Sequence, residues 1–344
     1  MKKFLGILLV LMLVLASFGA MAEEKQKLVI SAWPTNIDLI EKNVHAPFEE
    51  ANNCEIIVEV GNNSDRLTKL RENPSAYDIV YFSDKYVKDA AAEGLFADFD
   101  NSRLENFADL YEIAQNPNPG YGPGYTFTGF GIVYDPTVIE EPLTKWADLW
   151  REDVVYQLTV PAITVTSGPY FVEVAGKVAG TDVAVDDGPA FEKIKELSDG
   201  GAYFFEKSGD IAAKFQLGEI AVAVVQDFEF STIKEACPDA VYVMVPEEGT
   251  YLGINQINIV KDSANEELAY KYIDWAISQE VQLAQALDKV EAPANAKVEL
   301  TEEQAEGLCY GDPVTKSSAP NWDLIREKNA EWVDRYNNEI YLGK

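Results

Sequence analysis

Two polar segments of the chain carry side chains suited to binding a small solute. The first is Thr164-Val165-Thr166-Ser167-Gly168-Pro169, in which hydroxyls precede a proline that suits the first turn of a helix. Thr166, Ser167 and the free N–H groups of that turn can hold a phosphonate, phosphate or carboxylate. A plain helix cap explains the same residues equally well, so both interpretations stay open.

The second segment is acidic and follows the apolar run 221–225. Asp227 or Glu229 can neutralise a ligand amine, and either can equally be a helix-start acid that the helix dipole favours. Tyr121 and Tyr125 flank glycines and prolines in a loop, where they wall a cleft or only pack the loop. An anion site, an amine site and an aromatic wall together favour a zwitterionic or cationic organic ligand.

Enzyme motifs are missing from this sequence. It contains no Gly-x-Ser-x-Gly, no His-Glu-x-x-His and no phosphate-binding loop, and its single histidine, His45, excludes a multi-histidine metal site. We therefore expect no catalysis, no cofactor and no metal, with His45 packed on a helix face. A secreted hydrolase that uses a pair of carboxylates remains the alternative from another class, because such enzymes need no histidine.

Charge narrows the class of partner. The chain has 344 residues, with 28 Lys+Arg against 58 Asp+Glu and a net charge of −30, which repels nucleic acid and anionic lipid. The 47% hydrophobic fraction is that of a folded globular protein. We expect a monomer that binds no nucleic acid.

The first 22 residues read as a signal peptide. Lys2 and Lys3 precede an apolar run from Phe4 to Leu15, and Ala20-Met21-Ala22 matches the small-x-small cleavage pattern. The run is short for a membrane span. We expect cleavage after Ala22 and a mature protein in the periplasm.

Cysteine usage leaves two alternatives open. Cys54, Cys237 and Cys309 allow at most one internal disulfide, and Cys237–Cys309 is conceivable. Three buried unpaired thiols explain the sequence as well.

Strands and helices alternate along the chain. The pattern predicts strands at 28–32, 56–60 and 77–81, with helices between them, and a parallel α/β sheet covered on both faces. Residues 116–129 break this rhythm with prolines and glycines, and a strand resumes at 131–134. Strand–helix alternation then restarts and leads to a strand at 256–260, a long helix at 266–287 and a last helix marked by Trp322 and Trp332.

This pattern predicts two α/β lobes with a ligand cleft between them. We assign residues 23–132 with about 256–305 to lobe 1, and 133–255 with about 306–344 to lobe 2. Hinges are expected near 132–134 and 254–258. Because parallel sheets bind ligands beyond the carboxyl ends of their strands, the cleft is the expected site and hinge closure the expected binding motion.

Several motifs in order resemble the family 1 extracellular solute-binding proteins of ABC importers. The branch is the one that holds polyamine, ferric-ion, thiamine and aminoethylphosphonate binders. The motifs span nearly all of residues 26–300 and are Tyr77-Asp78-Ile79-Val80, Glu93-Gly94-Leu95-Phe96, Gly131-Ile132-Val133-Tyr134, Trp146-Ala147-Asp148-Leu149-Trp150, Gly218-Glu219-Ile220 and Pro246-Glu247-Glu248-Gly249.

The resemblance implies a type II periplasmic binding fold and delivery of a ligand to a membrane permease. It also implies ligand contacts, which we place at Trp33, Thr35, Asn36, Ser83, Lys85, Gln226 and Asn255, with Glu291 as a weaker candidate.

Several of these positions depart from the polyamine binders. Thr35 replaces an acid, Lys85 and Gln226 replace aromatics, and Asn255 replaces an aspartate. Lys85 would repel a bound polycation unless it points away.

These observations give a ligand hypothesis. The anionic end of a zwitterion would lie at Thr166–Ser167, its amine near Asp227 or Glu229, and its alkyl or ring part on Trp33 and Tyr125. Polyamine binding on the same fold is the alternative. A sensor subunit that signals to a receptor cannot be separated from a transport protein by sequence.

Overall fold

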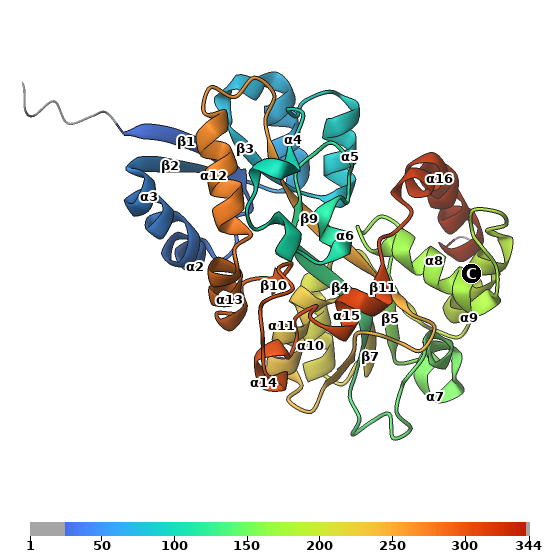
Figure 1. The fold of residues 1–344 in the computed structure, drawn as a ribbon. Coiled ribbons are helices and arrows are strands. Elements are labelled where there is room, and N and C mark those ends of the chain that lie inside the picture. The colour runs from blue at the N-terminus through green and yellow to red at the C-terminus, as the bar shows by residue number, and fades with distance from the viewer. Residues whose placement is uncertain (1–24, 342–344) are drawn as a thin grey trace, which may run out of the picture.

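The chain forms two α/β lobes that share two long strands, as the computed structural model of residues 25–341 shows (Figure 1). The first lobe's opening elements are β1 (Gln26–Ala32), α2 (Ile37–Ile40), α3 (Ala46–Asn52), β2 (Cys54–Val60), α4 (Asn63–Glu72), β3 (Ile79–Ser83), α5 (Asp84–Ala92), α6 (Glu112–Gln115) and β4 (Gly124–Tyr134). The second lobe contains α7 (Glu152–Val155), β5 (Leu158–Pro161), α8 (Gly168–Ala179), α9 (Gly188–Asp199), β6 (Tyr203–Phe205), α10 (Ile211–Gln216), β7 (Val222–Gln226), α11 (Phe230–Ala236) and β8 (Val241–Val243). The chain then forms β9 (Thr250–Ile259), α12 (Glu266–Ala276), α13 (Gln279–Leu287), β10 (Ala292–Pro293), α14 (Glu302–Ala305), α15 (Asp312–Lys316), β11 (Ser317–Ser318) and α16 (Trp322–Arg335).

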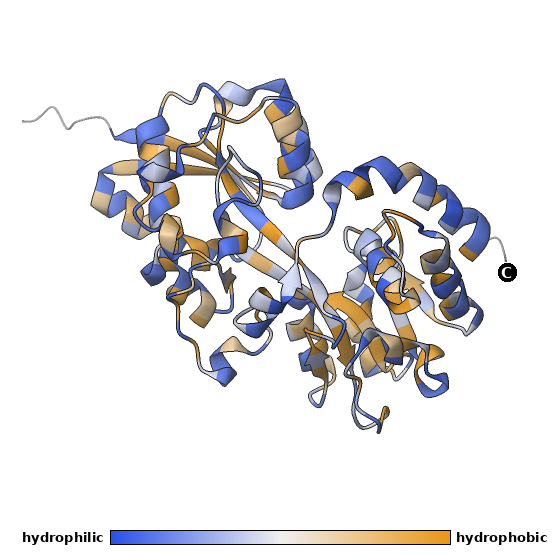
Figure 2. Cartoon of the chain, turned by 45° about the vertical axis from the view of Figure 1, so that its right-hand side comes forward, coloured by the Kyte–Doolittle hydropathy of each residue, from blue (hydrophilic) through white to orange (hydrophobic). Residues whose placement is uncertain are grey.

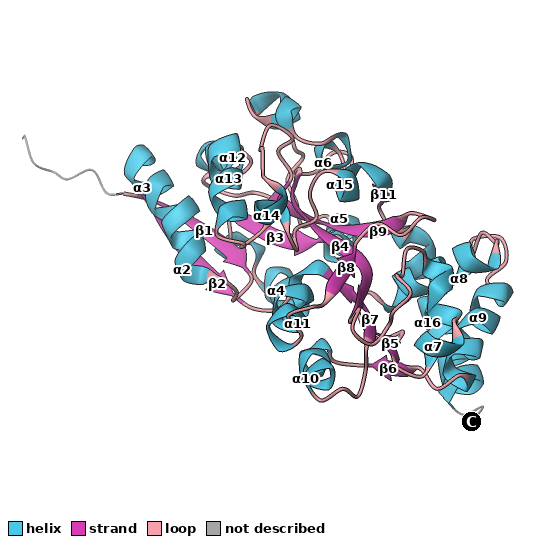
Figure 3. Ribbon diagram, turned by 90° about the horizontal axis from the view of Figure 1, so that it is seen from below, coloured by secondary structure: helices cyan, strands magenta, loops and turns pink. Residues whose placement is uncertain are grey.

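The strands lie in the order β2-β1-β3-β9-β4-β7-β5-β6. The outer strands of each lobe pair in parallel, whereas β9 runs antiparallel to β3 and β4, and β4 runs antiparallel to β7. Helices flank the strands on both sides in Figure 3. The predicted two-lobed α/β architecture is therefore confirmed.

Each lobe has its own apolar core. Leu28, Ile30 and Ile79 are fully buried in the first, and Val160, Phe171 and Val222 in the second. Figure 2 shows apolar strands inside both lobes and polar helix faces outside. Strands buried on both faces read as continuous apolar runs, which is why the sequence located them.

The two crossing strands differ from expectation. Strand β4 begins at Gly124, although the glycines and prolines of 116–129 predicted a loop throughout. Gly124–Gly129 pairs with β9, whereas Phe130–Tyr134 pairs with β7 in the second lobe. Asn255–Ile259 of β9 pairs with β3 in the first lobe. Residues 132–134 and 255–258 thus lie inside sheets, and we propose that the lobes pivot near Gly129–Phe130 and Leu252–Ile254.

Two further expectations about the carboxyl half need correction. The predicted helix at 266–287 is two helices, because Ser278 leaves the helical conformation and its hydroxyl accepts the N–H of Val281 to start α13. Cys309 and Val314 pack with the first-lobe core, whereas Trp322 to Ile340 pack with the second. We propose that the chain enters the second lobe near Ser317 and not at residue 306.

The three cysteines are buried and unpaired, so Cys237–Cys309 is not a disulfide. They lie in separate places: Cys237 packs in a second-lobe cluster and Cys309 among first-lobe residues. The predicted signal peptide lies outside the described residues. Within 25–341, no helix is both long and apolar enough to cross a membrane.

Candidate functional site

A cleft of about 950 Å³ lies between the lobes. Loops after β1, β2 and β3 line it from the first lobe, and the loop before α8 and the ends of β7 and α11 line it from the second. This is where a sheet's strand ends and helix starts converge, as expected for an α/β fold. The cleft is lined by most of the residues that the sequence singled out, namely Trp33, Thr35, Asn36, Ser83, Tyr125, Thr166, Gln226, Asp227 and Asn255.

Lys85 is not among the cleft residues. Its side chain is exposed on the first turn of α5, where Nζ lies 3.2 Å from the Asp89 carboxylate and 4.5 Å from the centre of the Tyr86 ring. Residues four apart share a helix face, which explains the pair. The predicted contact is wrong for this conformation, and the repulsion that argued against a polycation does not arise.

Ser167 also lies outside the cleft lining. It is 3% exposed at the start of α8, and its carbonyl accepts the N–H of Phe171. Thr166 is exposed and faces the cleft. Only one of the two predicted hydroxyls is therefore available to a ligand, which weakens the predicted anion site.

Two other candidates have structural roles. The Glu229 carboxylate accepts the backbone N–H of Gln226 at 3.0 Å, which completes the cap of its own helical turn. Tyr121 packs edge-on against Phe96, with ring centres 5.7 Å apart. Neither side chain lines the cleft.

Asp227 lies where the second-lobe wall meets the crossing strand. Its side chain is 7% exposed, and burial raises its pKa to about 7. The backbone N–H groups of Gly129, Phe228 and Cys309 favour the ionised form and partly offset that burial. Asp227 thus lies beside backbone N–H groups of β4, its own loop and the segment before α15, and it also borders the cleft.

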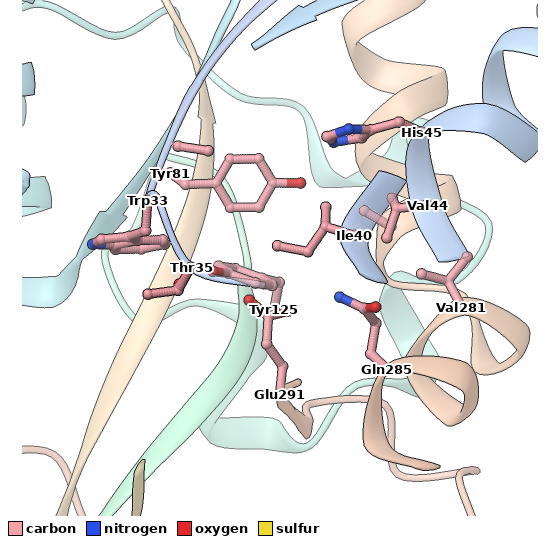
Figure 4. A pocket seen from close by; sticks show the side chains of 12 residues that line it. Trp33, Thr35, Ile40, Val44, His45, Tyr81, Tyr125, Val281, Gln285 and Glu291 are labelled. Carbon is pink, nitrogen blue, oxygen red and sulfur yellow. The ribbon is translucent and has the colours of Figure 1, made fainter. Parts of the chain in front are cut away.

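Glu291 is a half-buried acid of the cleft, on the first-lobe wall. It lines both the cleft and a smaller cavity of about 40 Å³ behind it. The Tyr125 hydroxyl and the Gln285 amide favour the ionised form of its carboxyl, and burial still raises its pKa to about 7. Figure 4 shows these three side chains around the same space. No lysine or arginine between residues 25 and 341 forms an ion pair with it.

Aromatic rings make up the wall beside Glu291. Trp33 and Tyr125 stack with ring centres 6.5 Å apart, and Tyr81 meets Tyr125 edge-on at 4.8 Å. The hydroxyl of Tyr81 shares a hydrogen bond of 2.9 Å with that of Tyr272. These contacts fix the rings, so the wall is formed before any ligand arrives.

His45 borders the inner cavity and is not a surface residue. It is 5% exposed, packs on Tyr272 and has its pKa lowered to about 4 by burial. It is therefore neutral at pH 7. The packing on a helix face that the sequence favoured is confirmed.

Sequence reasoning missed part of the lining. Residues without a local signal come from the unexpected start of β4, from α11 and the residue two before it, from the turn after α13 and from the segment after α14: Thr126, Phe127, Thr128, Phe228, Phe230, Ser231, Lys234, Glu235, Lys289, Glu306, Gly307 and Leu308. The alternation of polar and apolar residues at 125–130 was the one signal that could have revealed β4. Lys234 and Lys289 direct their ammonium groups to backbone carbonyls and keep their positive charge, and Lys234 also lies 3.7 Å from the Glu306 carboxylate.

Comparison with known proteins identifies what this architecture is similar to. The model of a family described as bacterial extracellular solute-binding protein matches residues 43–307. The crystal structure of an ABC transporter protein from Clostridium perfringens is 38% identical, with a TM-score of 0.84 over 91% of this chain and 99% of that chain.

Curated and structural relatives with named ligands are more distant. The putrescine-binding periplasmic protein SpuD of Pseudomonas aeruginosa is 23% identical over 319 residues, covering 85% of each chain. The spermidine/putrescine substrate-binding protein PotD of Streptococcus pneumoniae, solved with calcium and HEPES, is 21% identical, with a TM-score of 0.76 over 92% of this chain and 98% of that chain.

Proposed function

This chain belongs to the family of bacterial extracellular solute-binding proteins, and from that membership we propose that it is the substrate-binding component of an ABC importer. It captures a small nitrogen-containing organic solute by closure of the two lobes and delivers it to a membrane permease. The predicted type II periplasmic binding fold is confirmed by the likeness to solved substrate-binding proteins.

The cleft is the observation that carries this proposal. Its volume of about 950 Å³ lies in the range of small-molecule sites, and both lobes contribute to its walls. Rotation about β4 and β9 would bring Thr166 and Gln226 toward Trp33 and Ser83 and shut a ligand away from water. Binding needs no chemical step, which supports a transport protein over a hydrolase.

An ammonium-bearing ligand fits the wall chemistry. The Glu291 carboxyl has no cation beside it, and the rings of Trp33 and Tyr125 suit methylenes and positive charge. Polyamine binding is the alternative ligand assignment. The names of the curated relatives favour it, and the outward position of Lys85 removes the objection to it.

The same relatives support a proposal for the localisation of the protein. We propose export by the signal peptide of residues 1–22, cleavage after Ala22 and a monomeric protein in the periplasm. The curated relatives are periplasmic proteins, and the net charge of −30 disfavours nucleic acid and anionic lipid as partners.

A thermal-shift screen of residues 23–344 tests the function. The panel contains spermidine, putrescine, thiamine, 2-aminoethylphosphonate, amino acids and phosphate, and each protein sample is first unfolded and refolded to remove copurified ligand. A ligand at 100 times its Kd adds about 2.7 kcal/mol to the folded state, a rise of several degrees. Mass spectrometry of the native preparation identifies any solute carried through purification. If the protein turns over chromogenic glycosides and neither method detects a bound ligand, the hydrolase alternative replaces this proposal.

A further inference from the structure

The first-lobe wall of the cleft contains a buried cation. Arg66 of α4 is 1% exposed, and its guanidinium donates to the carbonyls of Gly61, Ser31 and Tyr81. These carbonyls lie at the ends of three neighbouring strands. Among the described residues no carboxylate pairs with Arg66, so its positive charge remains beneath the wall and burial lowers its pKa to about 10.

A directed chain of hydrogen bonds connects Arg66 to the cleft. Arg66 also donates to the side-chain oxygen of Asn63 at 2.8 Å, and because arginine only donates, the amide nitrogen of Asn63 must face the other way. That nitrogen donates to the Ser83 hydroxyl oxygen at 3.2 Å. The Ser83 hydroxyl does not cap α5, so its hydrogen is free to donate into the cleft. Ser83 therefore has a hydrogen to donate, and with one of its two lone pairs already occupied it favours a ligand acceptor beside it.

The opposite end of the same wall has the opposite polarity. Glu291 is held by one hydroxyl and one amide, with no cation to neutralise it. The cavity of about 40 Å³ behind it has room for a water or an ammonium group and is faced by Tyr81 and Tyr125. An ammonium group there would restore the ionised form of Glu291 and lie against aromatic rings.

Two rings separate these ends. The guanidinium of Arg66 lies 4.7 Å from the centre of the Trp33 ring, Trp33 stacks on Tyr125 at 6.5 Å, and the Tyr125 hydroxyl bonds to Glu291. The wall therefore runs from a cation to a carboxyl through two aromatic side chains. A diamine would place its second ammonium near Arg66 and beside a hydroxyl that donates, where like charges repel.

We propose that the cleft binds an ω-amino acid, with the ligand's carboxylate at Ser83 and its ammonium at Glu291, separated by an alkyl chain that crosses Trp33 and Tyr125. This inference rests on the proposed solute-binding function and names the class of solute. An α-amino acid is the contrasting class, because its charged groups share one carbon, whereas the rings of Trp33 and Tyr125, 6.5 Å apart, separate the two ends of the wall.

Matched ligands test the polarity of the wall by isothermal titration calorimetry. The refolded mature protein is titrated with 5-aminopentanoate, with its α-amino isomer norvaline, with 1,5-diaminopentane, and with pentanoate and pentylamine, which each keep one charged group. We expect 5-aminopentanoate to bind at least about 30-fold more tightly than each of the others. 4-Aminobutanoate and 6-aminohexanoate then define the spacer length.

Two variants test which end of the first-lobe wall binds which charged group of the ligand. Glu291→Gln should weaken the affinity for 5-aminopentanoate and pentylamine by about 30-fold or more and leave that for pentanoate within about twofold. Ser83→Ala should weaken the affinity for 5-aminopentanoate and pentanoate by about five- to tenfold and leave that for pentylamine unchanged. Glu280→Gln, which removes one exposed charge from α13, is the control and should change nothing. Unchanged circular dichroism of each variant shows that it is folded.

Three results would overturn the inference. Tighter binding of 1,5-diaminopentane than of 5-aminopentanoate would reverse the polarity at Ser83 and leave the solute-binding function intact. An equal loss of pentanoate and pentylamine binding in Glu291→Gln would show that Glu291 acts on the shape of the site and not on ligand charge. If no ω-amino acid of four to six carbons binds at millimolar concentration, the ligand class is wrong, and the mass spectrum of the native preparation decides the function separately.

Discussion

Each wall of the cleft contains an acid: Asp227 is buried, Glu291 is half-buried, and the two carboxyls have different partners. Asp227, on the second-lobe wall, faces backbone N–H groups of Gly129, Phe228 and Cys309. Glu291, on the first-lobe wall, has only the side chains of Tyr125 and Gln285 as partners. Burial raises the pKa of both groups to about 7, so the pKa alone does not distinguish them.

The donors around each carboxyl reveal the difference. Backbone N–H groups cannot turn elsewhere, so Asp227 is needed to satisfy them even when the cleft is empty. A tyrosine hydroxyl and an amide can find other acceptors, so neither of them requires the Glu291 carboxylate. We expect this carboxylate to lower the stability of the ligand-free protein and to find its partner in the bound ligand. We therefore propose that Asp227 serves the hinge and Glu291 serves recognition.

The largest expected effect comes from the cation behind the first wall. Arg66→Met leaves three strand-end carbonyls without their donor and should lower the free energy of unfolding by about 4 kcal/mol. Urea unfolding measures this change. Arg71→Met is the control, because its exposed pair with Glu93 contributes less than about 1 kcal/mol. Equal losses in the two variants would show that Arg66 does not hold the wall.

Removing the second-wall acid should also destabilise the protein. Asp227→Ala strips the acceptor from buried N–H groups at the crossing strand, and we expect a loss of about 3 kcal/mol at pH 8. Asp239→Ala removes an exposed acid nearby and should lie within about 0.5 kcal/mol of the wild type. An increase in stability would mean that Asp227, like Glu291, awaits a ligand.

Replacing Glu291 on the first-lobe wall should raise the free energy of unfolding of the ligand-free protein, whereas replacing Asp227 should lower it. The pKa of Glu291 is about 7 in the folded protein against 4.5 in the unfolded chain, so the folded state alone keeps the proton between these values. Wild-type stability therefore falls relative to Glu291→Gln as pH rises from 4.5 through 7. We expect the ligand-free variant to be about 2 kcal/mol more stable at pH 8 and equal to the wild type at pH 4. Thermal unfolding at the two pH values checks this, and a variant less stable at pH 8 would contradict it.

The smallest effect separates a residue that faces the cleft from a neighbour that does not. Ser83→Ala removes one hydrogen bond to the ligand, about 1 kcal/mol or a five- to tenfold loss of affinity. Lys85→Ala should leave the affinity within twofold, because Lys85 pairs with Asp89 on the outer face of α5. Calorimetry with the tightest ligand of the panel measures both. A larger loss from Lys85→Ala would place its ammonium in the closed cleft.

Sequence reasoning predicted the location of the cleft more accurately than it predicted which side chains line it. Ser83 and Gln226 line the cleft because each is the last residue of a strand that an apolar run reveals, whereas Asn255 lines it from within β9. Lys85 and Ser167 are only a residue or two from lining positions, yet the helix that begins beside each turns one outward and buries the other. Spacing along the chain predicts the neighbourhood of a residue, whereas the rotation of a helix decides its direction.

The start of β4 shows the same limit in the fold. Prolines and glycines at 117–124 correctly indicated a loop up to Pro123, but residues 124–129 form a strand because β9 pairs with them. The oxygen of Ile257 would lie 1.8 Å from a Cβ at Gly122, so this glycine allows the loop before β4 to approach β9 closely. A local pattern could not reveal a partner strand more than a hundred residues away.

The α/β class, the two lobes, the order of strands and helices, and the position of the cleft at the strand ends could all be predicted from the sequence. These follow from apolar periodicity and turn residues, which act over a few positions of the chain. Which acid is free depends on the folded chain, because Asp227 meets N–H groups from residues 129 and 309, while Glu291 meets side chains from β4 and α13. The charge that a buried group presents depends on every donor around it, and these donors come together only when the chain folds.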